Sequence, residues 1–479
     1  MADRKIMVGQ RVRRLRQERS LTQTQMAEQI GISTSYLNLI ERNQRPVTVQ
    51  FLLRLGQAYD IDLVQFAGDD EGRVAAQLKE VFSDPLFVRA AISPQDIEDI
   101  SGASPAGGEA VFTLYKAYRD LADAARQGGP VAEGAKGTKG TVGDGGANSP
   151  AEPVLDYLQG RDNYVPELEE LADALWTEED LSSDALFDDL RRVLEARHGV
   201  KTRVLPVDVM EETLRRYDRH GRRVLLSEAL SPGERTFQLA HQFALLHWAD
   251  GINEAVQGAG LTVNNERRLL RIALADYAAS AVLMPYSPFQ QAARDTRYDI
   301  ALLGRRFGAP VEQVCLRLAT LQRPGAKGIP LFLVQLDAAG NVVRRFSGNG
   351  FHVPRFGGLC PRWDAYGSAA SGDGSAARVV RTPDGTTFFT LAIRTVRPGG
   401  GQAALAPSIA TVIGCEAGQA RQMVAADGLV LDAEPAITPI GPSCRLCERV
   451  DCGHRAQPPL NRRLIIDENY LGYAPYFFT

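Results

Sequence analysis

Residues 11–59 are the most constrained stretch of the sequence, because turn and capping residues separate short helix-forming segments there. Thr22 precedes one such segment and is suited to cap a helix, and Gly31 supplies a tight turn at its end. Ser33 is the next capping residue, and Pro46 ends the helix that follows. The stretch therefore predicts a compact module of short helices.

The third helix of this module, residues 34–42, has the pattern of a recognition helix. Leu37 and Ile40 would pack inward, one helical turn apart. Base edges in a major groove would be reached by the outward residues of this helix and its cap, namely Ser33, Thr34, Ser35, Tyr36, Asn38 and Arg42. Gln23 and Arg45 are placed to hold phosphates. We expect this module to bind double-stranded operator DNA.

The fragments LTQ, GIS, SYLN and IER make this module resemble the Cro/C1-type (XRE) helix-turn-helix family. The resemblance covers about one eighth of the chain and implies a sequence-specific DNA-binding domain. Residues 1–60 hold ten Lys and Arg against five Asp and Glu, whereas the whole chain carries a net charge of −4. The positive charge is therefore local to the module, as DNA binding requires. The alternative is a small helical bundle without DNA contact.

The length and composition indicate several globular domains. A chain of 479 residues suits about three domains, and a hydrophobic content of 44% is enough to give each a core. The sequence contains no apolar run long enough for a membrane span and no secretory signal, so we expect a cytoplasmic protein. The six cysteines predict reduced thiols or metal ligands, because disulfides are rare in that compartment.

Composition changes divide the chain into five predicted segments. They are a helix-turn-helix domain (1–68), a helical arm (69–126), a flexible linker rich in Gly (127–153), a middle domain (154–324) and a C-terminal domain (325–479).

Within the arm, residues 74–82 and 108–126 predict amphipathic helices around a short acidic insert at residues 94–99. The middle domain combines helical patterns with two strand-like runs, which indicates an α+β fold. In the C-terminal domain the runs IPLFLVQLD, NVVRRF, FHVPRF and TTFFTLAIRTV alternate with Gly and Pro turns. The predicted fold class is therefore multidomain α+β, with an all-α head, an α+β middle domain and a mostly β C-terminal domain.

The segment FQLAHQFALLHW invites comparison with the HExxH helix of zinc peptidases. His241 is followed by Gln242 where the catalytic Glu would stand and by Leu245 where the second His would stand. His247 cannot replace that ligand, because six residues turn a helix by about 240° in total. Gln242 cannot deprotonate a zinc-bound water. We therefore predict no catalytic residues and no peptidase activity.

Together with RIALADYAASAVLMPY, this segment resembles the IrrE/ImmA peptidase-type domain in a degenerate form. We expect His241 to be a core or cleft histidine, since a zinc site needs three or four protein ligands. The retained cleft could still bind a small molecule. A metallopeptidase that cleaves a repressor is the alternative from another functional class.

Three C-terminal cysteines, Cys444, Cys447 and Cys452, form a C-x2-C-x4-C pattern that is typical of metal sites. His454 or a distant cysteine would supply a fourth ligand. With His454 or a distant cysteine the site could hold zinc, and with Cys360 or Cys415 it could hold an iron-sulfur cluster. Free thiols are the alternative.

The complete arrangement, including FGGLCPRW, IGCE and CRLCERVDC, resembles the short-chain fatty acyl (propionate/glyoxylate-pathway) transcriptional regulators of bacteria. The resemblance implies a regulator that responds to a short acyl-CoA and, in some members, a 4Fe-4S cluster on the tail cysteines. Zinc is the alternative metal. A redox-sensing regulator that needs no acyl ligand is a further alternative.

The residues for the effector are less sharply marked. Arg355, Arg362 and Trp363 surround a Gly-rich turn and could contact phosphate and adenine groups. The alternative is an ordinary turn with solvated arginines. We expect a non-enzymatic homodimer on a two-fold related operator, in which the effector shifts the placement of the two heads.

Overall fold

The structure is a computed structural model that describes residues 12–13, 15–16, 19, 21–41, 45, 47–59, 70–84, 87, 92–126, 151–348, 350–351, 353, 358–363, 367, 374–396, 408–434, 436–459, 462–470, 472–474 and 476–478. Two compact units divide the chain, residues 1–147 and residues 148–479. Of the predicted linker, residues 127–150 lie outside the described part.

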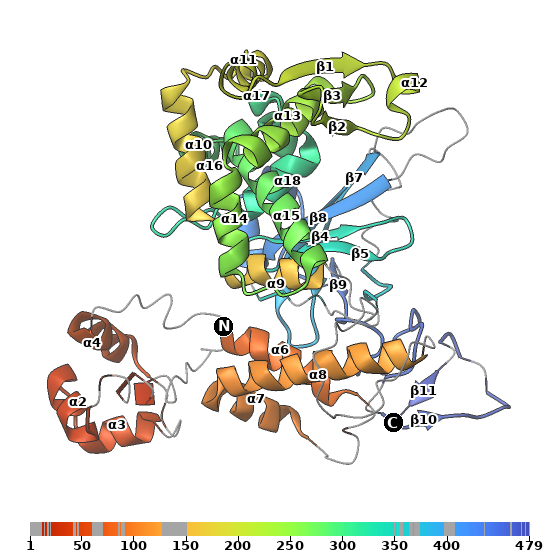
Figure 1. Ribbon diagram of the computed structural model, residues 1–479. Helices are drawn as coiled ribbons and strands as arrows, with labels where there is room; N and C mark the ends of the chain where they lie inside the picture. Colours follow the sequence, from red (N-terminus) through yellow and green to blue (C-terminus); the bar gives the residue numbers. More distant parts are fainter. Residues whose placement is uncertain are drawn as a thin grey trace, which may run out of the picture. The chain divides into compact units, whose positions relative to one another are not determined.

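The head contains the helices α2 (Gln23–Ile30), α3 (Thr34–Glu41) and α4 (Val49–Tyr59), after helical turns at Val12 and Leu15 (Figure 1). The Thr22 hydroxyl accepts a hydrogen bond from the Gln25 N–H, which fixes the start of α2. Gly31 ends this helix with a φ of 67°, which favours glycine. The predicted cap Thr22 and turn residue Gly31 are confirmed, while Pro46 lies outside the described residues.

The arm consists of α6 (Asp70–Phe82), α7 (Pro94–Ala103) and α8 (Pro105–Arg126). The prediction of an acidic insert at residues 94–99 is wrong, because these residues form the first turns of α7. The Ser93 hydroxyl accepts from the Asp96 N–H, and the Asp96 carboxylate accepts from the Ser93 N–H. Acidic residues in a first helical turn are stabilised by the helix dipole, so acidity here marks a helix start.

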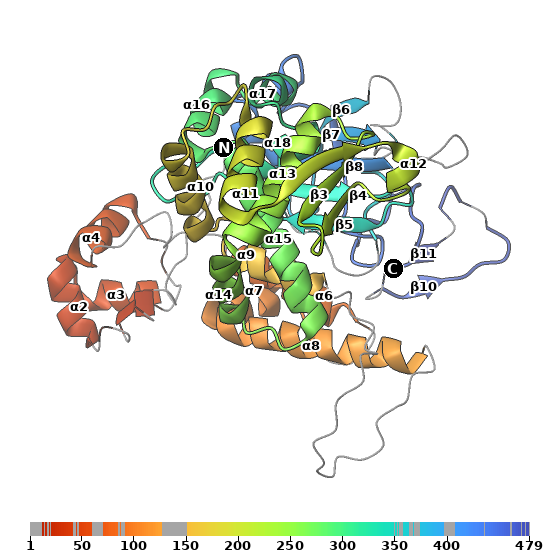
Figure 2. The same ribbon diagram turned by 45° about the horizontal axis from the view of Figure 1, so that its top comes forward.

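The second unit holds the remaining helices, drawn from yellow to blue in Figure 2. They are α9 (Glu152–Gly160), α10 (Pro166–Glu178), α11 (Leu186–His198), α12 (Val207–Met210), α13 (Pro232–His247), α14 (Ala249–Gly258), α15 (Asn264–Leu283), α16 (Tyr286–Asp295), α17 (Ile300–Phe307), α18 (Val311–Ala319), α20 (Ala417–Ala420) and the 3-10 turn η2 (Val424–Ala426). The central pair, α13 and α15, lies side by side (Figure 1).

A small sheet covers one end of this helical body. It has the order β1-β3-β2, from β1 (Lys201–Leu205), β3 (Arg223–Ser227) and β2 (Arg215–Asp218). The β1–β3 pair is parallel and the β2–β3 pair is antiparallel. The predicted α+β character of this part is confirmed.

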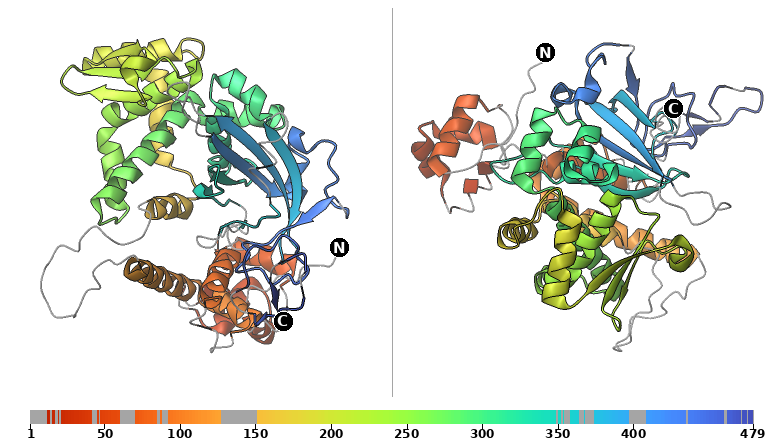
Figure 3. Two further views of the ribbon diagram at one scale, coloured as in Figure 1. Left: turned by 90° about the vertical axis from the view of Figure 1, so that its right-hand side faces the viewer. Right: turned by 90° about the horizontal axis from the view of Figure 1, so that it is seen from above.

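A larger sheet of six strands follows, in the order β5-β4-β8-β7-β6-β9 (Figure 3, left). Its strands are β4 (Phe332–Leu336), β5 (Val342–Phe346), β6 (Ser375–Arg381), β7 (Thr387–Val396), β8 (Ser408–Glu416) and β9 (Ile437–Pro439), and a separate hairpin joins β10 (Leu464–Ile465) to β11 (Phe477–Phe478). All neighbouring pairs in the large sheet are antiparallel except β6–β9.

One predicted strand, the run FHVPRF at residues 351–356, lies mostly outside the described residues. Phe351 and Val353 of the run FHVPRF are not in a strand, and their buried side chains pack against the large sheet instead. The Phe351 ring stacks on Phe332 with 4.0 Å between ring centroids. The two described residues of this run therefore belong to the core on that face of the sheet.

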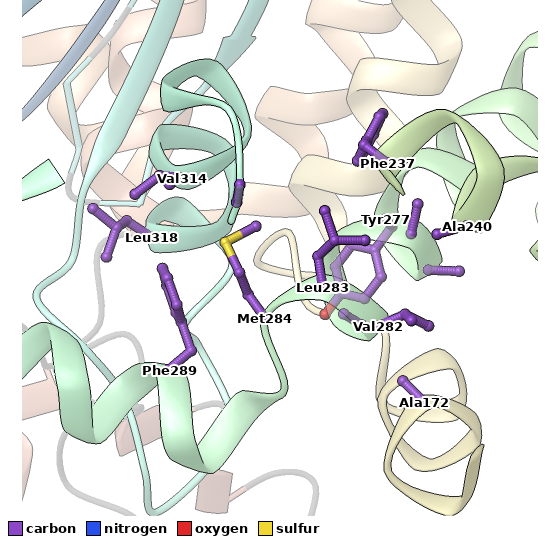
Figure 4. Close-up of a cluster of buried hydrophobic side chains, with 14 of the residues drawn as sticks. Ala172, Phe237, Ala240, Tyr277, Val282, Leu283, Met284, Phe289, Val314 and Leu318 are labelled. Atoms are coloured by element: carbon purple, nitrogen blue, oxygen red, sulfur yellow. The ribbon is translucent and has the colours of Figure 1, made fainter. Parts of the chain in front are cut away.

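Both faces of the large sheet are buried, and successive residues of a strand belong to different cores. Leu333 of β4 joins the core of the helical body, whereas Phe332 and Val334 join a second core on the other face. Figure 4 shows part of the first core, where Tyr277 and Leu283 from α15 meet Phe237 from α13. Burial on both faces favours continuous apolar strands such as β8.

A fully buried ion pair lies inside the helical body. Glu169 on α10 and Arg317 on α18 are 1% and 0% exposed, and the two guanidinium nitrogens donate to both carboxylate oxygens at 2.5 and 2.9 Å. The Tyr277 hydroxyl donates to Glu169 as well, at 2.5 Å. This network ties α10, α15 and α18 together around the first core.

No single helix among the described residues combines the length and apolarity needed to cross a membrane. Taken together, α15 and α16 have the length and apolar composition of a membrane span, but the two helices meet at an angle of 66°.

Candidate nucleic-acid interface and ligand sites

The face of α3 carries most of the predicted DNA-reading residues. The Ser33 hydroxyl accepts from the Tyr36 N–H at 3.2 Å, so Ser33 caps α3 as predicted. Leu37 and Ile40 are both buried, as predicted. Among the other predicted residues, Ser35 is exposed, and Thr34 and Asn38 are half-buried. Arg42 lies outside the described residues.

Tyr36 has a double role that the sequence did not indicate. Its ring packs edge-on against Phe51 at 6.4 Å, so part of it belongs to the head's core. The exposed Arg45 guanidinium lies 5.2 Å from the centre of the same ring. Tyr36 therefore fixes the cation that was predicted to hold phosphate beside the recognition helix.

A buried carboxylate joins the helices of the head. Glu41, at the end of α3, is 3% exposed and accepts from Arg16 Nε at 2.6 Å and from Gln23 Nε2 at 2.7 Å. Burial opposes ionisation of Glu41, but these hydrogen bonds and the charge of Arg16 hold its pKa below the usual value. Gln23, predicted as a phosphate contact, thus links the start of α2 to the end of α3.

The degenerate peptidase helix, α13, places His241 against α15. His241 is 2% exposed, and its Nδ1 lies 2.7 Å from Asp276 Oδ1. Gln242 is buried beside it, and Leu245 occupies the place of the second histidine. His247 bonds to His198 instead, with 2.9 Å between their ring nitrogens, so its predicted separation from His241 is confirmed.

His241 belongs to a cluster of polar residues with Asp276, Arg215 and Arg344, and we name this cluster the polar cleft after the cleft predicted for the peptidase-type domain. Arg344 on β5 lies 3.6 Å from Asp276, and the half-buried Arg215 on β2 adds a second positive charge. Burial lowers the pKa of Arg215 to about 10, so it stays charged at neutral pH. Two cations and one anion leave this cleft with net positive charge.

The histidine itself is an acceptor in this cleft. Burial, together with the charge of Arg215, lowers the pKa of His241 despite the hydrogen bond to Asp276. When the neutral ring donates from Nδ1 to Asp276, its Nε2 carries a lone pair. This buried Nε2 has no hydrogen-bond partner among the described residues. The cleft therefore offers two cationic groups and one acceptor, and no carboxylate in the position of a general base.

The thiols of Cys360, Cys444 and Cys447 are buried near residue 441. Burial raises the pKa of Cys360, and the backbone N–H of Gly441 opposes this while the charge of Cys447 adds to it. A Cβ atom at residue 441 would lie 2.7 Å from Cys447 Sγ, so only glycine fits there. The Cys444 sulfur accepts from the Ala456 N–H at 3.4 Å.

The chemistry of these ligands suits an iron-sulfur cluster or zinc, because all of them are cysteine sulfurs. The sulfurs of Cys360 and Cys444 also accept hydrogen bonds from backbone N–H groups. Cys452 is half-buried in the same loop, and His454 is exposed. In the described part of the chain, no three His, Cys, Asp or Glu side chains are close enough together to hold a metal ion. The loop would have to draw the sulfurs together when metal binds.

Cys415 lies on the opposite face of the large sheet from Cys360. It belongs to the core of the helical body, where its sulfur is 3.9 Å from that of Met423, whereas Cys360 belongs to the other core. The backbone of a sheet separates the side chains on its two opposite faces. Of the two distant cysteines, only Cys360 is on the side of the C-terminal loop.

Of the three residues predicted for the effector, the structure describes Arg362 and Trp363. Trp363 is 5% exposed and packs against Phe351 with 5.2 Å between ring centroids. Arg362 is half-buried next to it, and Arg355 lies outside the described residues. The polar cleft, which the sequence marked only through His241, brings Arg215 and Arg344 to the same carboxylate, Asp276.

Three models of known families match the chain. Residues 12–66 match the helix-turn-helix model, residues 195–319 match the IrrE N-terminal-like domain, and residues 320–476 match the C-terminal domain of the short-chain fatty acyl coenzyme A regulators. A helix-turn-helix domain, an IrrE-like domain and the C-terminal domain of these regulators together define a transcriptional regulator.

Full-length relatives place the chain more narrowly. The HTH-type transcriptional regulator PrpR of Mycobacterium tuberculosis is 36% identical over 98% of this chain and 96% of its own length. The propionyl-CoA carboxylase regulator of Cereibacter sphaeroides is 34% identical over 98% of both chains. A solved structure of a Mycobacterium tuberculosis transcriptional regulator superposes with a TM-score of 0.65 at 36% identity, covering 69% of this chain and 100% of that one. The chain belongs to the short-chain fatty acyl coenzyme A regulator family.

Proposed function

We propose that this protein is a cytoplasmic regulator of short-chain acyl metabolism that binds operator DNA as a homodimer and responds to a short acyl-CoA. The observation that carries the DNA-binding part is the face of α3, where Ser35 is exposed and Asn38 is partly accessible beside the Arg45 cation. The names of the relatives support the metabolic part, since one of them regulates propionyl-CoA carboxylase. The homodimer follows from the two-fold operators that such heads read.

Operator binding is tested by gel shifts on the region upstream of the chain's own coding sequence and on unrelated DNA. Asn38→Ala should lose the preference for the operator, because an amide that reads a base edge gives specificity. Arg45→Ala should weaken binding to both DNAs alike, because a phosphate contact carries no sequence information. Arg216→Ala, an exposed cation on the body, is the matched control. Identical shifts for all variants would refute the assignment of α3.

For the effector we propose the polar cleft in place of the Gly-rich turn. Arg215 and Arg344 provide charge for an anionic group such as a phosphate, and His241 Nε2 provides an acceptor for an N–H or O–H of the ligand. An acyl-CoA carries phosphates, amide N–H groups and hydroxyls. The ligand would therefore satisfy both the net positive charge and the unpaired buried nitrogen.

The strand β5 connects this cleft to the start of the second unit. Arg344 faces Asp276, while the next residue, Arg345, forms an ion pair with Glu152 on α9. Consecutive residues of a strand point to opposite sides, so one strand contacts both partners. The Gln159 amide also binds Ser347, through 2.6 and 2.8 Å hydrogen bonds. We propose that ligand in the cleft shifts α9, which follows the linker from the head.

Ligand binding is tested by a thermal-shift screen of acyl-CoA thioesters. A ligand that binds the folded state alone raises its melting temperature. Arg344→Ala should abolish the shift, whereas Arg394→Ala, an exposed arginine on β7, should retain it. A shift that survives Arg344→Ala would place the effector outside the cleft, and a flat screen on the wild type would remove the effector from the proposal.

We further propose a 4Fe-4S cluster on Cys360, Cys444, Cys447 and Cys452, with zinc as the alternative metal. Such a cluster supplies redox chemistry or a structural cross-link. The chain's own contribution is a set of buried thiols with N–H groups directed at the sulfurs of Cys360 and Cys444. Anaerobic purification with metal analysis tests this, because a cluster absorbs near 400 nm and zinc does not. Neither iron nor zinc in the product would refute it.

A further inference from the structure

Arg455 is a buried cation at the centre of the cysteine loop, which we define as residues 441–457. Its side chain is 3% exposed. The guanidinium donates to the carbonyl oxygens of Cys444 at 2.9 Å, Cys447 at 3.0 Å and Arg449 at 2.6 Å. A single planar group therefore fixes the backbone on both sides of the C-x2-C pair.

Two further contacts hold this arginine in place. The same guanidinium donates to the carbonyl oxygen of Gln457 at 3.3 Å. The Phe478 ring of β11 lies 4.5 Å from its central carbon, which is a cation–π contact. Phe478 thus packs against the buried arginine.

The charge of Arg455 has no carboxylate partner in the described part of the chain, where its hydrogen bonds end on neutral carbonyl oxygens. A buried charge is costly unless an opposite charge lies nearby. Two of the four carbonyl groups that it holds belong to cysteines, and metal-bound cysteines are thiolates. A metal centre with thiolate ligands would place negative charge next to this cation.

We propose that Arg455 is the positioning residue of the metal centre: it holds the backbone of Cys444 and Cys447 while the loop draws their sulfurs onto one metal, and it offsets the charge of the thiolates. This role rests on the metal centre of the proposed function. It does not depend on whether the metal is iron or zinc, because both bind thiolate.

The experiment compares wild type with Arg455→Gln, Arg455→Lys and the control Arg445→Gln in the full chain. Arg445 is an exposed arginine of the same loop whose Nε donates to Gln457. After anaerobic purification, metal per chain and the rate of metal loss to a chelator are measured for each protein. The midpoint potential is measured where iron is bound, and the melting temperature is measured with and without metal.

Arg455→Gln should hold less than half of the wild-type metal and lose it about tenfold faster, whereas Arg445→Gln should match wild type. Arg455→Lys keeps the charge but loses the planar fork, so metal loss should quicken while the potential stays near the wild-type value. In an iron-loaded chain, Arg455→Gln should lower the midpoint potential, because a nearby cation favours the more negative reduced state. A tenfold change in the ratio of reduced to oxidised centre corresponds to about 59 mV for one electron.

Metal content, release rate and potential that all remain at wild-type values in both Arg455 variants would overturn the proposal. An equal fall in melting temperature in the metal-free and metal-loaded variants, without faster metal loss, would assign Arg455 a structural role only and would overturn it too. A wild-type chain that binds no metal fails differently, since it removes the metal centre itself and leaves Arg455 nothing to position.

Discussion

Replacing Glu169 by glutamine should destabilise the second unit, because it removes the only carboxylate bound to Arg317 in the described structure. Arg317 is fully buried, so its charge would remain in the core without a counter-charge. Breaking a buried pair by removing one partner costs about 3–5 kcal/mol. The amide oxygen of Gln can still accept one hydrogen bond, so we expect a loss of about 3 kcal/mol.

Tryptophan fluorescence during denaturant unfolding measures this loss selectively. All three tryptophans, Trp176, Trp248 and Trp363, lie in the second unit, so the head does not contribute to the signal. The control is Glu167→Gln, two residues away, where the ion pair with Arg161 is largely exposed. An exposed pair contributes less than about 1 kcal/mol.

A double variant tests the reason for the loss. Arg317→Met added to Glu169→Gln removes both charges, and the stability should return to within about 2 kcal/mol of wild type. A Glu169→Gln variant that unfolds like wild type, or a double variant less stable than Glu169→Gln alone, would refute the reasoning.

The same pair predicts a pH dependence. Burial disfavours the ionised form of Glu169, but the charge and hydrogen bonds of Arg317 outweigh burial and lower its pKa. A lowered pKa gives stability that is fully present above the unfolded value of about 4.3 and is lost as the pH falls towards the folded value. The difference in unfolding free energy between wild type and Glu169→Gln should therefore shrink below about pH 4.

Three further variants test other parts of the molecule. Glu41→Gln should lower both the melting temperature of the head and its operator affinity, because Arg16 and Gln23 lose a charged hydrogen-bond acceptor. Each of these hydrogen bonds is worth about 1.5–3 kcal/mol. Unchanged gel shifts and an unchanged circular dichroism melting curve would show that this network does not stabilise the head. Trp363→Ala should cost about 3–5 kcal/mol in denaturant unfolding and spare acyl-CoA affinity, since the ring is packed in a core; a selective loss of ligand affinity would return Trp363 to the effector pocket. Arg345→Ala should keep acyl-CoA affinity and reduce the change in operator affinity that the ligand causes; an undiminished change would exclude β5 as the connection.

Local signals in the sequence were enough to predict the head. Thr22, Gly31 and Ser33 act on backbone groups within about one helical turn, so their roles follow from their positions in the chain. The absence of a catalytic pattern at Gln242 and Leu245 is also a local fact. By contrast, the acidic residues after Ser93 were misread as an insert, because acidity is shared by solvated loops and by first helical turns.

The sequence by itself determined the recognition helix, the degenerate peptidase helix and the spacing of the C-terminal cysteines, since each depends on residues a few positions apart. The tertiary structure alone decided which distant side chains meet: Asp276 and Arg344 around His241, and Cys360 on the same side of the sheet as the cysteine loop. It also decided that Trp363 is a core residue. These contacts join segments separated by tens of residues, and they follow from how helices and strands pack, which no short sequence pattern records.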